Sequence, residues 1–204
     1  MPTAGTGRHS PAPATVPPND LHARTLSLRQ MDRTWVRLHR CRVQATHFGR
    51  ARKYRFDAPK GEFGVLYAGE NDACAFIEVF GDPLDVRILS LRVLEQYCLT
   101  DIRATRPLRL VDLTGPGLRH LGADARITGG GDYEASRRWA LGLWAHPDKP
   151  DGILYRSRHD PSLQAVAVLD RAASTLRIRG RRRLANDRAV LAGLLDRYGF
   201  GLID

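Results

Sequence analysis

Two segments, FGVLYAGENDACAFIEVFGD at residues 63–82 and DGILYRSRHD at residues 151–160, decide the fold that this sequence predicts. The first begins as a short strand and continues as a helix over residues 72–80, which Asn71 or Asp72 would cap. The apolar residues of this helix fall at i, i+3, i+4 and i+7, the spacing of a stripe that faces a core: Ala73, Phe76, Ile77 and Phe80.

Glu78 projects from a different face of the expected helix. Its helical neighbours on that face are Cys74 and Ala75, two small residues in place of the arginines expected on a wet surface of this arginine-rich chain. That face is therefore expected to be covered or to line a cleft. A carboxylate in such a place is costly unless a cation, a hydrogen-bond donor or a ligand meets it. Glu78 is thus a candidate functional residue on sequence grounds alone.

Length and composition predict one folded domain. The chain has 204 residues and is 43% hydrophobic, which is enough for a single core. Residues 1–30 are rich in Pro, Ala, Thr and Ser, so we expect a flexible tail there and a domain over residues 31–204. No run of about 18 apolar residues could span a bilayer, and the N-terminus lacks the apolar core of a signal peptide. We expect neither export nor membrane insertion.

The cysteines give no sign of a metal site. Cys41, Cys74 and Cys98 are an odd number at wide spacings, without a CxxC pair or a Cys/His cluster of zinc type. A reducing cytoplasm fits this usage best. Cys74 reads as a small packing residue, because no neighbouring base is evident to activate its thiol.

The net charge of +10 invites a nucleic-acid interpretation that the details weaken. Only three of the 32 basic residues are lysines, a skew that a GC-rich genome could produce without any function. The densest basic run, at residues 177–183, lacks the interleaved aromatic residues of a base-stacking surface. A solvated face is favoured there over a phosphate-binding patch.

The order of expected elements predicts an α+β fold, a single domain with mixed small sheets and flanking helices. Residues 43–61 read as a long loop, and the GGGD sequence at residues 129–132 lacks the context of a phosphate-binding loop. We expect strands at residues 35–40, 63–69, 85–94, 108–115, 153–157 and 163–170, and helices at residues 72–80 and 133–146.

Several short segments in this order and spacing form a recognisable combination. They are Leu38-His39-Arg40, Tyr54-Arg55-Phe56, Val65-Leu66-Tyr67-Ala68 followed by Glu78, VDLTG at residues 111–115, and Asp151, Gly152, Ile153, Tyr155 and Ser157. Together they resemble the RES domain family, which is named for its Arg, Glu and Ser, over residues 34–204. His39 departs from the Tyr that is more common in the family, and Arg37 and Arg42 lie close enough to Arg40 to be alternatives for the first Arg.

The resemblance implies a fold similar to ADP-ribosyltransferases and a reaction on NAD. RES proteins look like toxins of bacterial toxin–antitoxin pairs that deplete NAD or transfer its ADP-ribose, which implies a small antitoxin as partner and no metal. The resemblance also implies roles for five residues. Glu78 would be catalytic with Ser157, whereas Arg40, Arg55 and Tyr67 would bind the substrate.

Elementary chemistry agrees with these residue types. Cleavage of the bond between nicotinamide and ribose develops oxocarbenium character, which a carboxylate such as Glu78 stabilises. Guanidinium forks on Arg40 and Arg55 suit the two negative charges of the NAD pyrophosphate. Tyr67 could pack on nicotinamide, and the Ser157 hydroxyl could bond a ribose oxygen or orient Glu78.

Two alternatives stay open on the sequence. One is a basic module that binds nucleic acid through the arginine run, and the other is a family member that binds NAD without cleaving it. The acceptor of ADP-ribose, whether water, phosphate or protein, is also open, and a homo-oligomer is compatible with the sequence. A basic enzyme of this kind would favour an acidic antitoxin.

Overall fold

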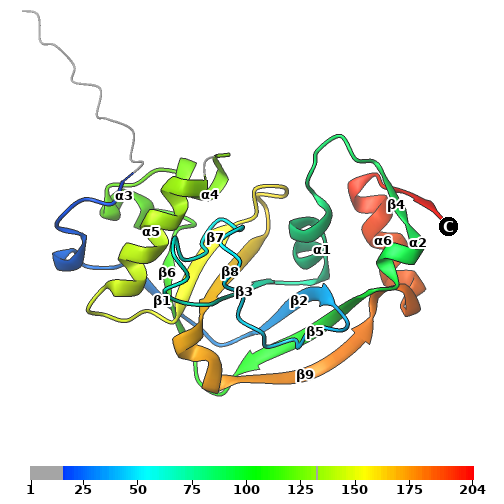
Figure 1. The fold of residues 1–204 in the computed structure, drawn as a ribbon, viewed down its shortest axis with the longest axis horizontal. Coiled ribbons are helices and arrows are strands. Elements are labelled where there is room, and N and C mark those ends of the chain that lie inside the picture. Colours follow the sequence, from blue (N-terminus) through cyan, green and yellow to red (C-terminus); the bar gives the residue numbers. More distant parts are fainter. Residues whose placement is uncertain (1–15, 132) are drawn as a thin grey trace, which may run out of the picture.

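An eight-stranded sheet organises the chain in the computed structural model, which describes residues 16–131 and 133–204 (Figure 1). The strand order is β1-β6-β7-β8-β3-β2-β5-β9. Neighbouring strands are antiparallel except for β6 and β7, which are parallel. The strands are β1 Leu28–Met31, β2 Thr34–Arg40, β3 Val65–Gly69, β5 Tyr97–Ala104, β6 Leu108–Asp112, β7 Gly152–Arg156, β8 Gln164–Leu169 and β9 Leu176–Arg183.

Helices and a second, two-stranded sheet complete the described part of the chain. The α-helices are α1 Asp72–Phe80, α2 Leu91–Leu94, α3 Gly117–Leu121, α4 Arg126–Gly129, α5 Tyr133–Ala145 and α6 Arg188–Tyr198. Short 3₁₀ turns are η1 Leu21–Ala23, η2 Asp170–Thr175 and η3 Leu184–Asn186. The small parallel sheet pairs β4 Ile88–Ser90 with β10 Gly201–Ile203. Helices α3, α4 and α5 gather at one end of the molecule, whereas α1 and α6 lie toward the other (Figure 1).

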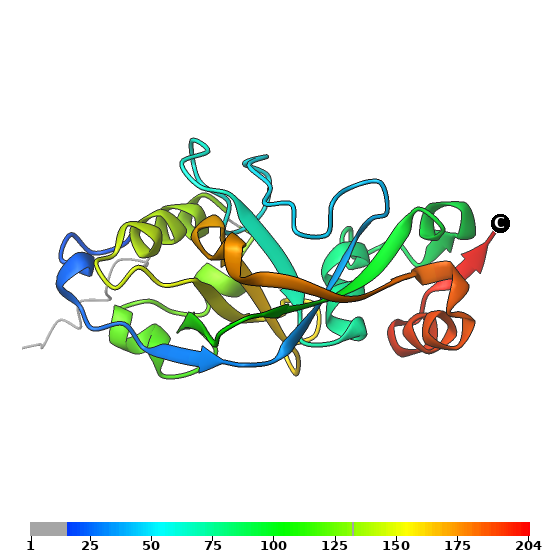
Figure 2. The same cartoon turned by 90° about the horizontal axis from the view of Figure 1, so that it is seen from below.

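The sheet curls because it is barely joined between β2 and β3. These strands share a single register pair, Val36 with Gly69. Beyond it the edge of β3 pairs with the long loop instead, through reciprocal backbone hydrogen bonds between Gly49 and Val65. As a result β2, β5 and β9 run across the bottom of the molecule, away from β7 and β8, which rise beside α5 (Figure 2 gives the perpendicular view).

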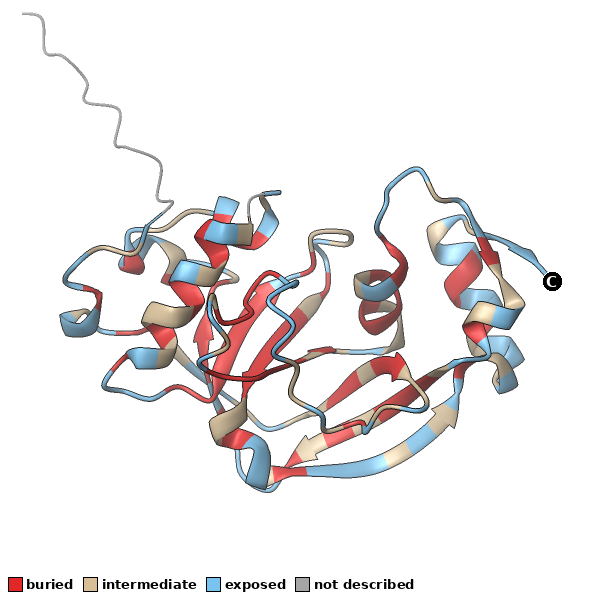
Figure 3. Cartoon of the chain, viewed as in Figure 1, coloured by how far each residue is buried: buried red, intermediate tan, exposed pale blue. Residues whose placement is uncertain are grey.

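Three apolar clusters stabilise this arrangement by removing side chains from water. One lies between the sheet and α5 and includes Phe63 and Trp139. A second packs on the opposite face of the sheet around Leu66 and Trp35. The third joins α1 to β2, β5 and α6, with Phe76 at its centre. The buried residues of Figure 3 follow these three clusters along the sheet and the inner faces of the helices.

The structure confirms the predicted α+β class and the helix at residues 72–80. The Asn71 side chain caps that helix by accepting a hydrogen bond from the Cys74 backbone N–H. Phe76, Ile77 and Phe80 of the predicted stripe are buried. The helix predicted at residues 133–146 runs from Tyr133 to Ala145, and the two strands after residue 151 are neighbours, as predicted.

One predicted strand is wrong, and several elements were not predicted. Residues 85–94 form only the short β4 followed by one turn of α2. The neighbouring β5 was missed because Thr100 and Asp101 interrupt its apolar alternation, although Thr100 is buried and bonds the His39 ring. Strand β1 and helix α6 were not predicted either.

Part of the expected tail packs against the domain. Residues 1–15 lie outside the described residues. Further along, Leu21 and Leu26 are buried in the cluster under α5, and β1 pairs with β6 from Leu28 to Met31. The composition of residues 1–30 predicted a flexible tail, but burial of these few leucines is enough to hold its second half against the domain.

Two of the three cysteines are paired in the structure. Strand pairing places Cys41, just beyond β2, next to Cys98 of β5, and a disulfide joins them with a Cα–Cα distance of 5.0 Å. The two cysteines are 57 residues apart in sequence, and their proximity depends on the register of β5, which was not predicted. Among the described helices, none is long and apolar enough to cross a membrane.

Asp151 ties β7 to its neighbours. Its carboxylate accepts two hydrogen bonds from the Arg106 guanidinium, at 2.6 and 2.8 Å, and one from the Arg109 backbone N–H at 2.8 Å. Its backbone bonds Arg109 on β6 and Leu169 on β8. Burial raises the pKa of Asp151, but these hydrogen bonds lower it by more, so the pKa lies below its ordinary value.

We expect Asp151→Asn to lower the free energy of unfolding by about 1–3 kcal/mol, because the Asn amide places N–H groups against N–H donors. Since the folded pKa of Asp151 is depressed, its contribution is present at neutral pH and is lost as pH falls below the unfolded value of about 3.9. Urea denaturation at pH 7 and at acid pH measures both effects.

Asp32→Asn is the matched control, because Asp32 also pairs with one arginine, Arg103, but has a side chain that is 56% exposed. A surface pair of this kind contributes about 0–1 kcal/mol. Equal losses of stability in the two variants would contradict the role assigned to Asp151.

Candidate active site

Helix α1 and strand β7 bring Glu78 and Ser157 together. The Ser157 hydroxyl donates to Oε1 of Glu78 at 2.7 Å, and the Tyr155 hydroxyl donates to Oε2 at 3.3 Å. Glu78 is half-buried, whereas Ser157 and Tyr155 are buried. The carboxylate is therefore held by one hydroxyl on each oxygen. Hydrogen-bond donors thus meet Glu78, one of the three kinds of partner that its expected burial called for.

Ser157 also holds the turn that follows β7. Its Oγ accepts hydrogen bonds from the backbone N–H groups of His159 and Asp160, both at 3.2 Å. With its proton donated to Glu78, the hydroxyl is oriented by three partners. Ser157 is thus fixed by local backbone geometry, as expected of a serine at a strand end.

Arg55 enters the same region from the long loop between β2 and β3. Its side chain is buried, donates from Nη1 to the carbonyl oxygen of Gly130 at 2.7 Å, and lies 4.7 Å over the Tyr133 ring. Its Nη2 has no hydrogen-bond partner among the described residues. Burial lowers the pKa of Arg55, while Tyr133 and, more weakly, Glu78 raise it. A buried cation with an unused donor is costly unless a ligand supplies the acceptor.

Tyr67 positions the loop that carries Arg55. Its hydroxyl donates to Oδ1 of Asp57 at 3.0 Å and accepts from the Phe56 backbone N–H at 2.9 Å. Asp57 in turn accepts hydrogen bonds from the backbone N–H groups of Lys53 and Tyr54. Burial, and next the charge of Asp57, raise the pKa of Tyr67 well above its ordinary value. The hydroxyl is thus engaged within the chain, and the ring touches Tyr54 edge-on at 5.7 Å.

A second arginine near the site was not predicted. Arg158 follows Ser157 in the same turn, bonds Oδ1 of Asp82 at 2.6 Å and lies within 3.3 Å of the Tyr133 hydroxyl. The next residue, His159, has a side chain that is 7% exposed and an Nε2 that lies 3.6 Å from Asp82. Burial lowers the pKa of His159, which keeps its ring neutral at pH 7.

Arg40 lies apart from this group. Its guanidinium packs 4.6 Å over the Tyr97 ring and bonds Gln96. Tyr97 in turn contacts Phe80, on the side of α1 that faces β5 and not the side that carries Glu78. Arg37, the alternative for the first Arg, donates to the carbonyl oxygens of two loop residues, 45 and 47, each at 2.7 Å. Burial lowers the pKa of Arg37 to about 10.

The site residues that sequence reasoning missed come from segments with weak local signals. Tyr155 stands inside the quoted motif but was not assigned to the site. Tyr133 begins α5 and Arg158 follows the motif, and only the fold shows that they share the Arg55 environment. The GGGD segment, which was not expected to bind phosphate, supplies the carbonyl oxygen of Gly130 to Arg55.

No group of three or more His, Cys, Asp or Glu side chains in the described part of the chain could hold a metal ion. Cys74 is buried beside Glu78 and donates to the carbonyl oxygen of Gln164. Burial, reinforced by the charge of Glu78, raises the pKa of Cys74 to about 12, so its thiol is not a nucleophile at neutral pH.

Comparisons with known proteins match both sequence and fold. A family model described as RES domain matches residues 34–187. A probable toxin named y4kH from Sinorhizobium fredii (strain NBRC 101917 / NGR234) is 26% identical over 115 residues, which are 56% of this chain and 90% of that protein. The crystal structure of the M. tuberculosis MbcT–MbcA toxin–antitoxin complex has a chain that matches with a TM-score of 0.66 and 18% identity, covering 83% of this chain and 92% of that one.

We expect Tyr67→Phe to lower the free energy of unfolding by about 1–3 kcal/mol, because it leaves the buried Asp57 carboxylate and the Phe56 N–H each short of a partner. Tyr54→Phe is the matched control on the same loop, since Tyr54 is exposed. It should change stability by less than about 0.5 kcal/mol. Guanidinium denaturation measures both, and an unaffected Tyr67→Phe protein would show that the loop is held by other contacts.

Proposed function

This chain belongs to the RES domain family, and on that premise we propose that it is a toxin-type enzyme that cleaves the nicotinamide–ribose bond of NAD. The acceptor of the ADP-ribose would be water, phosphate or a protein. The observation that carries the proposal is that one region holds both the Glu78 carboxylate, which two hydroxyls bind, and the buried Arg55, which keeps an unused donor.

In this proposal Glu78 stabilises the positive charge that develops on the ribose as nicotinamide leaves. A fixed carboxylate acts most on the transition state, where the charge is largest, and less on the ground state. Ser157 and Tyr155 hold both carboxylate oxygens, so little reorganisation is needed when the charge appears. The nonpolar surroundings of Tyr155 strengthen the interaction, because charges attract more strongly where water is excluded.

Arg55 is the proposed ligand of the NAD pyrophosphate. A guanidinium can present two parallel N–H groups to phosphate oxygens, and Nη2 of Arg55 is unused. Arg158 is a further cation near the Tyr133 ring. Tyr67 would have two roles. Its hydroxyl fixes the loop that carries Arg55, and its ring would pack on nicotinamide, as the sequence suggested.

The names of the relatives support the proposal that this chain is a toxin and that an antitoxin inhibits it. One is a probable toxin, and the other is described as part of a toxin–antitoxin complex. We propose a small antitoxin partner for this chain, acidic because a chain with net charge +10 favours complementary charge on encounter. The proposed place of action is the cytoplasm, where NAD is available, and no metal is required.

We expect Glu78→Gln to lower NAD cleavage by about 100-fold or more while the protein stays folded, because the amide keeps the shape but removes the charge. NAD consumption and nicotinamide release by the purified protein, with and without phosphate, measure the effect and identify the acceptor. Expression of the wild-type chain alone in a bacterium should also slow growth and lower cellular NAD.

Glu95→Gln is the matched control, because Glu95 is an exposed carboxylate next to α2. It should cleave NAD as the wild type does. Turnover by Glu78→Gln within a few-fold of wild type would remove Glu78 from the mechanism. If soluble expression of the wild-type chain neither slows growth nor lowers cellular NAD, the toxin proposal is wrong.

We expect Arg55→Lys to weaken NAD binding about 10- to 100-fold, because one ammonium cannot replace two parallel N–H donors. Titration calorimetry on a Glu78→Gln background measures binding without turnover. Arg40→Ala is the comparison, since Arg40 lies across α1 from Glu78 and should bind NAD within about twofold of the background protein. Clearly weaker NAD binding by the Arg40→Ala variant would show that Arg40 does contact the pyrophosphate, as the sequence suggested.

A further inference from the structure

The turn at residues 157–163, between β7 and β8, determines where the Ser157 hydroxyl points. Two backbone N–H groups of this turn, those of His159 and Asp160, donate to Ser157 Oγ, which itself donates to Glu78. Movement of the turn would therefore rotate or displace the hydroxyl that holds the carboxylate. Whatever fixes the turn therefore also fixes the hydroxyl that holds Oε1 of Glu78.

Helix α6 contacts this turn through hydrogen bonds to Asp160. Oδ2 of Asp160 accepts from Nη2 of Arg197 at 2.9 Å and lies 3.1 Å from the Tyr198 hydroxyl. Its Oδ1 accepts from the backbone N–H and the hydroxyl of Ser162. The Asp160 side chain is only 16% exposed, whereas Arg197 is 47% exposed. The carboxylate is thus saturated with donors, and two of them come from α6.

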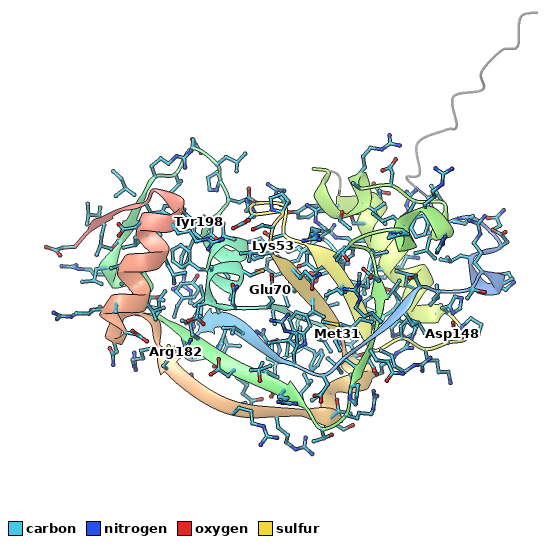
Figure 4. The ribbon with its side chains drawn as sticks, turned by 180° about the vertical axis from the view of Figure 1, so that it is seen from behind. Met31, Lys53, Glu70, Asp148, Arg182 and Tyr198 are labelled. Carbon is cyan, nitrogen blue, oxygen red and sulfur yellow. A yellow bond between two sulfur atoms is a disulfide. The ribbon has the colours of Figure 1, made fainter. Side chains whose placement is uncertain are left out.

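Tyr198 links α6 to α1 as well. Its hydroxyl lies 3.3 Å from the carbonyl oxygen of Ala73 in the first turn of α1, and its ring stacks on Phe76 with an interplanar angle of 9°. The Arg197 guanidinium lies 5.5 Å over the same ring. Figure 4 shows Tyr198 between α6 and α1, seen from behind. The turn is therefore held at one end by Asp82, through Arg158, and at the other by α6.

The matched range of the family model ends at residue 187, one residue before α6 begins. We propose that Arg197 and Tyr198 of α6 are positioning residues, which hold Asp160 and thereby aim the Ser157 hydroxyl at Glu78. This inference rests on the proposed function of Glu78. An exposed ion pair contributes little to stability, but a displacement of about 1 Å at a reacting group can cost about 100-fold in rate. The contact is therefore expected to matter for geometry more than for folding.

The test compares Arg197→Gln, Tyr198→Phe and their double variant with Arg103→Gln. The last removes an arginine from another surface pair, Arg103 with Asp32, which has no contact with the turn. In the double variant we expect hydrogen exchange of residues 158–163 to quicken about tenfold or more. We also expect kcat for NAD cleavage to fall about tenfold, with KM within about twofold, because the reacting group loses its alignment while the substrate contacts remain.

Two further variants separate positioning from a general loss of structure. Arg197→Lys keeps a cation that can reach the single oxygen Oδ2, so kcat should return to within about threefold of wild type. Arg103→Gln should alter neither the exchange of the turn nor kcat. Both Arg197→Gln and Tyr198→Phe are expected to fold, since Arg197 is exposed and the Phe ring keeps the stacking on Phe76.

The outcomes are distinct. Unchanged exchange of residues 158–163 in the double variant would show that α6 does not hold the turn. Faster exchange with unchanged kcat would overturn the positioning role and leave a purely structural contact. If the wild type consumes no NAD, the proposed function and the catalytic part of this inference both fail, whereas the exchange comparison still decides whether α6 holds the turn.

Discussion

The structure depends on one requirement, that the Glu78 carboxylate at the junction of α1 and β7 be met by donors. A half-buried carboxylate without partners would carry a desolvation penalty. Tyr155 of β7 and Ser157, two residues further along the chain, satisfy it. This requirement fixes the register of β7 relative to α1, because a slip of one residue would turn both hydroxyls to the other face of the sheet.

Arg55 shows the complementary constraint. The loop that carries it is folded back onto β3 by the Tyr67 and Asp57 hydrogen bonds, which hold the guanidinium under the Tyr133 ring. The Nη2 atom of this buried guanidinium remains without a partner among the described residues. An unsatisfied buried donor lowers the stability of the folded state. Such donors are often found at sites that bind a ligand.

Local sequence patterns predicted what depends on local geometry. The buried positions Phe76, Ile77 and Phe80 of α1 follow from helical periodicity, and Asn71 was one of the two predicted caps. The Cys41–Cys98 disulfide depends on pairing between distant strands, which no local pattern encodes. The same reason explains the place of Arg40. The motif gave its position in the sequence, but only the packing of Tyr97 against Phe80 shows on which side of α1 it lies.

The arginine run of β9 illustrates why composition alone could not assign a function. Arg182 donates twice to Asp72 at the start of α1 and also lies 3.3 Å from Asp101, so this member of the run holds the helix that carries Glu78. Arg181 bonds the carbonyl oxygen of Cys41 beside the disulfide. At least these two charges are committed within the molecule. The net charge of +10 therefore overstates the cationic surface that β9 could offer to a nucleic acid, and Arg182 contributes to the site by holding α1.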